Sequence, residues 1–140
     1  MSRENMEVVH SIYAAWERGD YSFNDWAHPE IQFVLADGPS PGTRRGLTGM
    51  TEGWRDFLSV WEEFSSVVEG YRELDDERVL VLHHWGGRGK TSGLEVTQMT
   101  AKAATVFHIR DGKVTRLVIY FDRERAFAAL GLASDTRVRE

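Results

Sequence analysis

The feature that most limits the possible folds of this chain is a change in the spacing of its apolar residues near Phe64. Before Phe64 the apolar residues recur at helical spacing, and after it they alternate with polar residues, as in half-buried strands. Four such segments follow one another: Ser65–Leu74, Arg78–Arg88, Leu94–Ile109 and Lys113–Phe121. Consecutive strands with short connections form a mostly antiparallel sheet, and helices earlier in the chain then cover one of its faces. The spacing therefore predicts an α+β domain.

Four helices are predicted around this run of strands. The first has one apolar face, formed by Met6, Val9, Ile12, Tyr13 and Trp16. A short second helix is predicted at Ser22–Ala27. A third begins at about Thr48 and carries a wide apolar stripe that marks it as central to the core: Met50, Trp54, Phe57, Leu58 and Trp61. The last is Arg123–Leu130, because Asp122 suits its N-cap and Gly131 the position after its C-cap.

The remaining segments complete one domain over residues 1–132, followed by a tail at 133–140. Ile31–Ala36 alternates as a strand does, and Asp37–Arg45 is predicted to be a loop because it holds two of the three prolines. Asp111–Gly112 indicates a two-residue hairpin turn. The predicted order is therefore α-α-β-α-β-β-β-β-α. A curved sheet wrapped over helices encloses a cavity, which is where we expect a function to lie.

Composition excludes several classes of function. The chain has 140 residues and a formal charge of −5, with no basic cluster, so we expect no nucleic-acid partner. Cysteine is absent, which excludes thiolate catalysis and agrees with a cytoplasmic location. No run of 18 apolar residues is present, so we expect no membrane span. The glycine-rich segment Gly86–Gly93 lacks the first glycine of a phosphate-binding loop and precedes a strand pattern.

Histidine spacing does not favour a metal site. The five histidines, which show no spacing typical of metal ligands, are His10, His28, His83, His84 and His108. His83 and His84 are neighbours on a predicted strand, so they point to opposite faces and cannot easily share one ion. We therefore expect neither a metal nor another cofactor.

Three polar residues near the expected cavity are candidates for catalysis. A carboxylate at Asp37, at the end of the first strand, could abstract a proton beside a carbonyl, or it could instead begin a turn. Tyr13 could donate a hydrogen bond to a developing oxyanion, or it could be a core residue. One of His83 and His84 must face inward, and His84 is our candidate for the acid–base group, the alternative being a histidine without chemistry.

The residues that carry a family resemblance are spread over almost the whole domain. They are Ile12–Asp20 (IYAAWERGD), His28–Phe33 (HPEIQF), Gly42–Gly46 (GTRRG) before the helix with Trp54, Arg110–Val114 (RDGKV) and Tyr120–Leu132. In this order and spacing the chain resembles the SnoaL-like branch of the NTF2-like superfamily. That group includes polyketide cyclases, ketosteroid isomerase and limonene epoxide hydrolase.

The resemblance implies a fold and a partner. The fold is a cone, in which a strongly curved, mostly antiparallel sheet wraps around about three N-terminal helices and a short C-terminal helix follows. An apolar pocket lies inside the cone, and many members form homodimers through the outer face of the sheet. With the residues analysed above, this gives a set of expected pocket-lining side chains: Trp16, Phe33, Trp54, Phe57, Trp61, Thr105, Phe107 and Ile119.

The resemblance transfers catalytic residues poorly. Counting back from Gly46 places Asp37 at the position of the isomerase base, whereas Thr105 stands where that enzyme has a second acid. Ile119 stands where the epoxide hydrolase has an aspartate. Our first hypothesis is a pocket protein for an apolar carbonyl or epoxide compound, with proton-transfer chemistry (isomerisation, cyclisation or hydration). The alternative is a ligand-binding or dimerisation module without catalysis.

Overall fold

Nine elements make up the part of the chain that the computed structural model describes, which is residues 2–18, 20, 26–37, 41–59, 61–89 and 97–132. Within these ranges the side chains of residues 2, 3, 61–63, 88, 89 and 97–101 are not described. In chain order the elements are α1 (Ser2–Glu17), β1 (Ala27–Leu35), β2 (Gly42–Arg45), α2 (Gly46–Ser59), β3 (Trp61–Glu73), β4 (Arg78–Gly89), β5 (Thr97–Arg110), β6 (Lys113–Tyr120) and α3 (Arg123–Leu130).

The strands form one curved sheet in the order β2-β1-β6-β5-β4-β3. All neighbouring pairs are antiparallel except β1 and β6, which are parallel. The four later strands are neighbours in the order in which they occur, as expected for strands with short connections. The prediction of an α+β domain with a mostly antiparallel sheet is confirmed.

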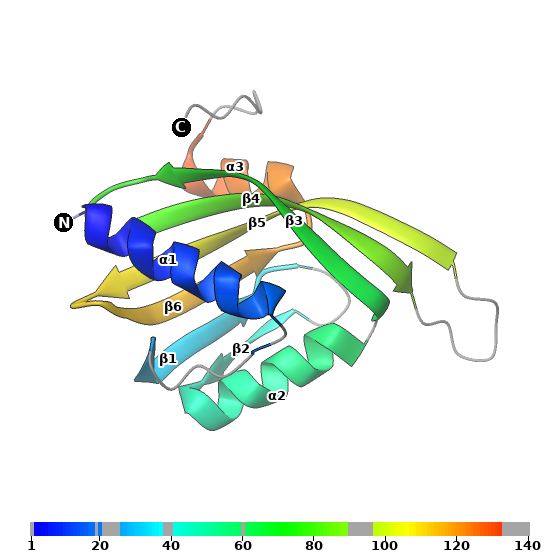
Figure 1. The fold of residues 1–140 in the computed structure, drawn as a ribbon, viewed down its shortest axis with the longest axis horizontal. Coiled ribbons are helices and arrows are strands. Elements are labelled where there is room, and N and C mark those ends of the chain that lie inside the picture. Colours follow the sequence, from blue (N-terminus) through cyan, green and yellow to red (C-terminus); the bar gives the residue numbers. More distant parts are fainter. Residues whose placement is uncertain are drawn as a thin grey trace.

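Helices lie on both faces of this sheet. α1 and α2 lie on the concave face, and α3 packs on the opposite face (Figure 1). Alternation along β4 and β5 serves both sides: Val79, Val81 and Phe107 belong to the core beneath α1 and α2, whereas Leu82 and Val106 pack with α3. Because both faces of β4 are buried near its start, Val79–Leu82 is apolar at every position.

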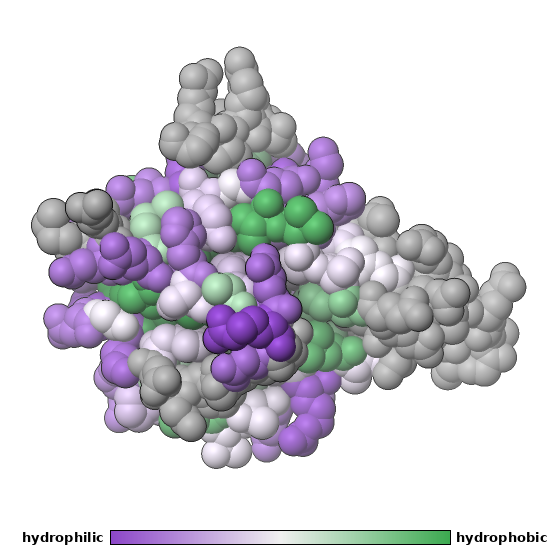
Figure 2. All heavy atoms as spheres, in the orientation of Figure 1, coloured by the Kyte–Doolittle hydropathy of each residue, from purple (hydrophilic) through white to green (hydrophobic). Residues whose placement is uncertain are grey.

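The outer surface carries little exposed apolar area in the part of the chain described. Apolar side chains reach the face shown in Figure 2 in separate areas between hydrophilic ones. Among the described residues, Val67 of β3 is the one large apolar side chain that is exposed, at 62%. No described helix is both long and apolar enough to cross a membrane. A homodimer through the outer sheet face stays a prediction.

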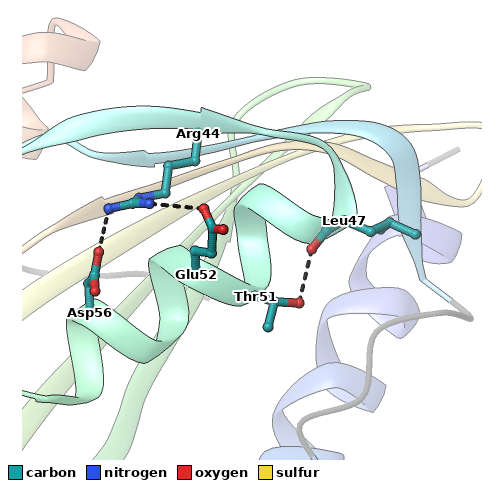
Figure 3. Close-up of polar contacts among 5 residues, drawn as sticks. All are labelled: Arg44, Leu47, Thr51, Glu52 and Asp56. Atoms are coloured by element: carbon teal, nitrogen blue, oxygen red, sulfur yellow. Dashed lines mark hydrogen bonds and ion pairs between the residues drawn. The ribbon is translucent and has the colours of Figure 1, made fainter.

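Contacts between β2 and α2 fix the helix that forms one wall of the cavity. Arg44 of β2 forms ion pairs with Asp56 and, at 3.4 Å, with Glu52, both on α2 (Figure 3). Gly53 faces β1 so closely that a Cβ atom there would lie 2.4 Å from the ring of Phe33. This close approach requires glycine, and it turns the neighbouring Trp54 toward the interior.

The predicted turn and caps near the C-terminal end are confirmed. Asp111 and Gly112 both have positive φ, 53° and 78°, as a two-residue hairpin turn requires. The Asp122 side chain accepts a hydrogen bond from the backbone N–H of Glu124 at the start of α3, and Gly131 ends the helix with φ 72°. Local turn and cap chemistry was therefore sufficient to place these boundaries.

Two predicted boundaries were wrong, and a third prediction lies mostly outside the described residues. The helix expected at Ser22–Ala27 lies mostly outside the described residues, and Ala27 itself belongs to β1. The loop expected at Asp37–Arg45 contains β2, whose residues pair with β1 although they lack an apolar alternation. Trp61 begins β3 and does not extend α2. Pairing with a distant segment stabilises each of these strand residues, and the local pattern does not contain that information.

Candidate functional site

A cavity of about 420 Å³ lies between α1, α2 and the concave side of β3, β4, β5 and β6. Six of its fourteen described lining residues are Tyr, Trp or Phe: Tyr13, Trp16, Trp54, Phe57, Phe64 and Trp85. The helical spacing of Tyr13 and Trp16 places both on the inner side of α1, and α2 contributes Trp54 and Phe57 in the same way.

The aromatic rings support one another by edge-to-face contacts. Trp54 lies 5.1 Å from Trp16 and 5.5 Å from Phe57, between ring centroids. Phe57 in turn packs edge-on against Trp85, at 5.1 Å, and Phe64, at 5.5 Å. Such pairs contribute about 0.5–1.5 kcal/mol each beyond their buried area. Rings held by their neighbours keep this wall in place without a ligand.

A short chain of hydrogen bonds crosses the cavity wall formed by α1 and the sheet. The Nε2 atom of His83 lies 2.8 Å from the Oγ1 atom of Thr105, and both side chains are buried. Thr105 also forms a hydrogen bond with the phenol of Tyr13. The rings of Tyr13 and His83 are 6.3 Å apart, so both ends of this chain belong to the same cavity.

These groups are uncharged at neutral pH. Burial and, to a smaller extent, the cation of Arg123 together lower the pKa of His83 to about 3. Burial raises the pKa of the Tyr13 phenol, although the hydrogen bond with Thr105 opposes this effect. The site therefore contains a neutral imidazole and a neutral phenol, which can exchange hydrogen bonds with a ligand oxygen.

Arg123 lies directly behind the site, on the other side of the sheet. It is the first residue of α3 and is 6% exposed. Its guanidinium donates to the backbone carbonyl groups of His83 and Ala103, and it pairs with Glu69 at 2.6 Å. Arg123 thus holds the two strands that carry His83 and Thr105 and places a positive charge close to the imidazole.

Most of the predicted pocket residues do line the cavity. Those that do are Trp16, Trp54, Phe57, Thr105 and Ile119, and the catalytic candidate Tyr13 lines the cavity as well. Phe33 and Phe107 instead lie in the core just behind the wall, with their rings 5.2 Å from Trp54 and 5.9 Å from Tyr13 respectively. The side chain of Trp61 lies outside the described residues.

The structure places His83 in the cavity wall, and not the predicted His84. His84 is exposed on the outer face, whereas His83 is 2% exposed and lines the cavity. Both faces of β4 carry apolar side chains, because Val79 and Val81 face α1 while Leu80 and Leu82 face α3. The alternation therefore gave no sign of which face was inner. Trp85, which shares the face of His83, was the available signal, since a large aromatic residue favours the thicker core.

The carboxylate of Asp37 does not reach this cavity. Its Oδ1 atom accepts a hydrogen bond from the N–H of Phe121 at 2.6 Å, and its Oδ2 atom accepts one from the N–H of Asp122 at 3.2 Å. It lines a separate hollow with Pro41 and Arg125. Asp37 thus holds the end of β6 beside the end of β1, which is the turn-forming alternative to a catalytic role.

We expect Asp37→Asn to weaken the fold and to leave the main cavity unchanged. An amide offers one acceptor oxygen to the two N–H groups, so we expect the free energy of unfolding to fall by about 1–2 kcal/mol. Urea denaturation followed by circular dichroism measures this loss. A variant that keeps its stability but loses affinity for a cavity ligand would contradict this structural role.

Other chemistry-bearing groups near the cavity were not anticipated. Ser65, Ser66 and Glu17 line it as well, and none belongs to a recognisable motif. Across the ranges that the structure describes, His, Asp and Glu residues form no group of three that could hold a metal ion. The absence of a cofactor stays a prediction.

Comparison with known proteins points to one family and one fold. A family model for the SnoaL-like domain matches residues 9–117. TerC, whose crystal structure was determined with polyporic acid, is 25% identical, with a TM-score of 0.70 over 91% of this chain and 97% of that chain. A search of curated proteins found no match.

Two further solved structures share the fold at lower identity. An NTF2-like protein of unknown function from Burkholderia pseudomallei is 22% identical, with a TM-score of 0.73 over 93% of this chain and 98% of its own. A hypothetical protein with a ketosteroid isomerase-like fold from Catenulispora acidiphila, in complex with trimethylamine, is 19% identical. Its TM-score is 0.64 over 94% of this chain and 98% of its own.

Proposed function

Since this chain belongs to the SnoaL-like domain family, we propose that it binds an uncharged, largely aromatic small molecule whose oxygen hydrogen-bonds to the cavity wall. The observation that carries the proposal is the cavity itself, in which an aromatic lining surrounds the neutral groups of Tyr13, Thr105 and His83. Its volume of about 420 Å³ lies within the range of small-molecule sites.

The charges around the cavity favour a neutral ligand. Among the described residues that line it, Glu17 alone is charged at neutral pH, and that side chain is exposed. An anionic ligand would lose its hydration without gaining a cationic partner from these residues, which is unfavourable. TerC, a structural neighbour at 25% identity, was crystallised with polyporic acid, which supports small-molecule binding in this fold.

The same groups favour hydrogen bonding to a carbonyl over removal of a proton from carbon. A neutral imidazole and a phenol can stabilise negative charge that develops on a ligand oxygen. An imidazole with a pKa of about 3 is a weak base at neutral pH, where efficient general bases have a pKa near the working pH. We therefore place ligand binding and carbonyl polarisation first, and isomerisation or cyclisation second, because Asp37 is remote.

Calorimetric titration with a matched pair of compounds tests the proposal. 2-Naphthol and 2-naphthoate share one aromatic skeleton, but only the second is an anion at pH 7. We expect 2-naphthol to bind at least about tenfold more tightly, which corresponds to about 1.4 kcal/mol. Equal or tighter binding of the anion would contradict a neutral site.

One pair of threonine variants shows whether binding takes place in this cavity. Thr105→Val removes the hydroxyl that joins Tyr13 to His83, so we expect the affinity for 2-naphthol to fall severalfold. Thr115→Val is the matched control, because Thr115 donates to the carbonyl of His108 and does not line the cavity. Equal effects of the two changes would place the ligand elsewhere.

A further inference from the structure

Two buried polar atoms of the cavity wall have no hydrogen-bond partner within the described part of the chain. They are the Oγ atom of Ser66 on β3 and the Nδ1 atom of His83 on β4. Both residues line the cavity. Leaving a buried polar group without a partner costs about 1–3 kcal/mol, so such atoms in a native protein need an explanation.

The register of the sheet places Ser66 and His83 on the same face. Ser66 lies opposite Trp85 in the antiparallel pair of β3 and β4, and His83 is two residues from Trp85 along β4. Ser66 and His83 are therefore diagonal neighbours on the cavity face, a relation in which Cα atoms are about 7–8 Å apart. A small molecule in the cavity can span a separation of this size.

The neighbouring polar groups are already occupied, which makes these two atoms distinct. Ser65 also lines the cavity, but its hydroxyl donates to the carbonyl of Gly86 at 3.3 Å. Thr105 is hydrogen-bonded to both Tyr13 and His83. Among the described residues of the wall, the free hydrogen-bonding capacity is thus concentrated at Oγ of Ser66 and Nδ1 of His83.

The chain of hydrogen bonds determines what can meet the imidazole. If Tyr13 donates to Thr105 and Thr105 donates to Nε2 of His83, the imidazole carries its proton on Nδ1 and donates to a ligand carbonyl. If the chain runs the other way, Nδ1 accepts from a ligand hydroxyl. The hydroxyl of Ser66 can also donate or accept. Both positions therefore suit oxygen functions, either ketone or hydroxyl.

We infer that the ligand of the cavity carries two oxygen functions, one bound to Nδ1 of His83 and the other to Oγ of Ser66. This inference rests on the proposed function, because it presupposes that a small molecule occupies the cavity. It adds that the ligand is an apolar skeleton oxygenated at two positions several ångströms apart, such as a hydroxyketone, a diketone or a diol.

A comparison of mono- and dihydroxylated naphthalenes tests the inference. We would titrate the protein calorimetrically with 2-naphthol and with the 1,3-, 1,5-, 2,6- and 2,7-dihydroxynaphthalenes, whose two oxygens differ in spacing. Because a net hydrogen bond contributes about 0.5–1.5 kcal/mol, we expect the best-fitting diol to bind roughly 2- to 12-fold more tightly than 2-naphthol. In Ser66→Ala the best-fitting diol should lose this advantage over 2-naphthol.

Ser65→Ala provides the matched control on the same strand. Its hydroxyl already has a partner in Gly86, so the advantage of the diol should persist in this variant. A ¹⁵N spectrum of the His83 ring adds a readout that does not depend on any substitution. The Nδ1 resonance should shift when the best-fitting diol binds, because that atom gains its missing hydrogen bond.

The possible failures separate the two proposals. If 2-naphthol binds but no diol shows an advantage that depends on Ser66, the two-oxygen inference is wrong and the proposed function stands. A diol advantage that is equal in Ser66→Ala and Ser65→Ala has the same meaning. If none of the compounds binds, the proposed function is overturned, and the inference is overturned with it.

Discussion

Replacing Arg123 with methionine is expected to lower the free energy of unfolding by about 3 kcal/mol. The guanidinium of Arg123 is buried and donates to two backbone carbonyl groups, at 3.0 Å to His83 and 3.4 Å to Ala103. Methionine fills a similar volume, but it has no N–H group, so these two carbonyl groups lose the hydrogen bond that the guanidinium donates. Urea denaturation at pH 7.5 measures the loss.

A second arginine on the same helix gives the control. Arg125 has a side chain that is 70% exposed, and it pairs with Asp122 at 3.7 Å and, more distantly, with Asp37 at 4.0 Å. Exposed pairs contribute about 0–1 kcal/mol, so Arg125→Met should change stability little. Losses of similar size in the two variants would show that the burial of Arg123 has no special effect. The Arg123 variant should also raise the pKa of His83, since the nearby cation lowers it in the wild type.

Much of the fold was predictable because its signals are local. Apolar spacing identified α1, α2 and the four later strands, and the Asp111–Gly112 turn and the Asp122 cap depend on residues next to them in the sequence. β2 was missed because its four residues, GTRR, form a strand only by pairing with β1. The burial of Arg123 was missed for a similar reason, since its partners lie on β3, β4 and β5.

The candidate site was predictable only where helices form it. Tyr13, Trp16, Trp54 and Phe57 follow from helical spacing, which identifies the inner face directly. On β4 the same reasoning failed, because α3 makes the outer face as apolar as the inner one. The polar chain from Tyr13 to His83 joins α1, β5 and β4, so it exists only in the folded chain. A residue that is chemically suitable, such as Asp37, is therefore not evidence of a site until its neighbours are known.

Acidification is expected to destabilise the protein through His83, and the sign follows from its pKa. The pKa is about 3 in the folded state and 6.5 for an unperturbed imidazole, so the unfolded chain binds the proton more readily. The protonation of His83 therefore has no effect on the free energy of unfolding above about pH 7.5. Its destabilising effect grows as the pH drops through 6.5 toward 3. At pH 5 the expected loss from this residue is about 2 kcal/mol.

A glutamine variant isolates this effect from other titrating groups. Among the described residues, those that face His83 from other elements are Tyr13, Thr105 and Arg123. A phenol, a hydroxyl and a guanidinium keep their charge state between pH 8 and pH 5. His108 also has a pKa lowered by burial, so wild-type stability alone would combine the two imidazoles.

His83→Gln keeps a polar group near Thr105 and removes the titration, so its stability between pH 8 and pH 5 should fall by about 2 kcal/mol less than that of the wild type. Urea denaturation at pH 8, 6 and 5 gives this difference directly. His84→Gln serves as the control on the exposed side of the same strand, and it should follow the wild type at each pH. If His83→Gln also followed the wild type, the imidazole of His83 would be able to take up a proton inside the folded protein, and the neutral character of the cavity would have to be abandoned.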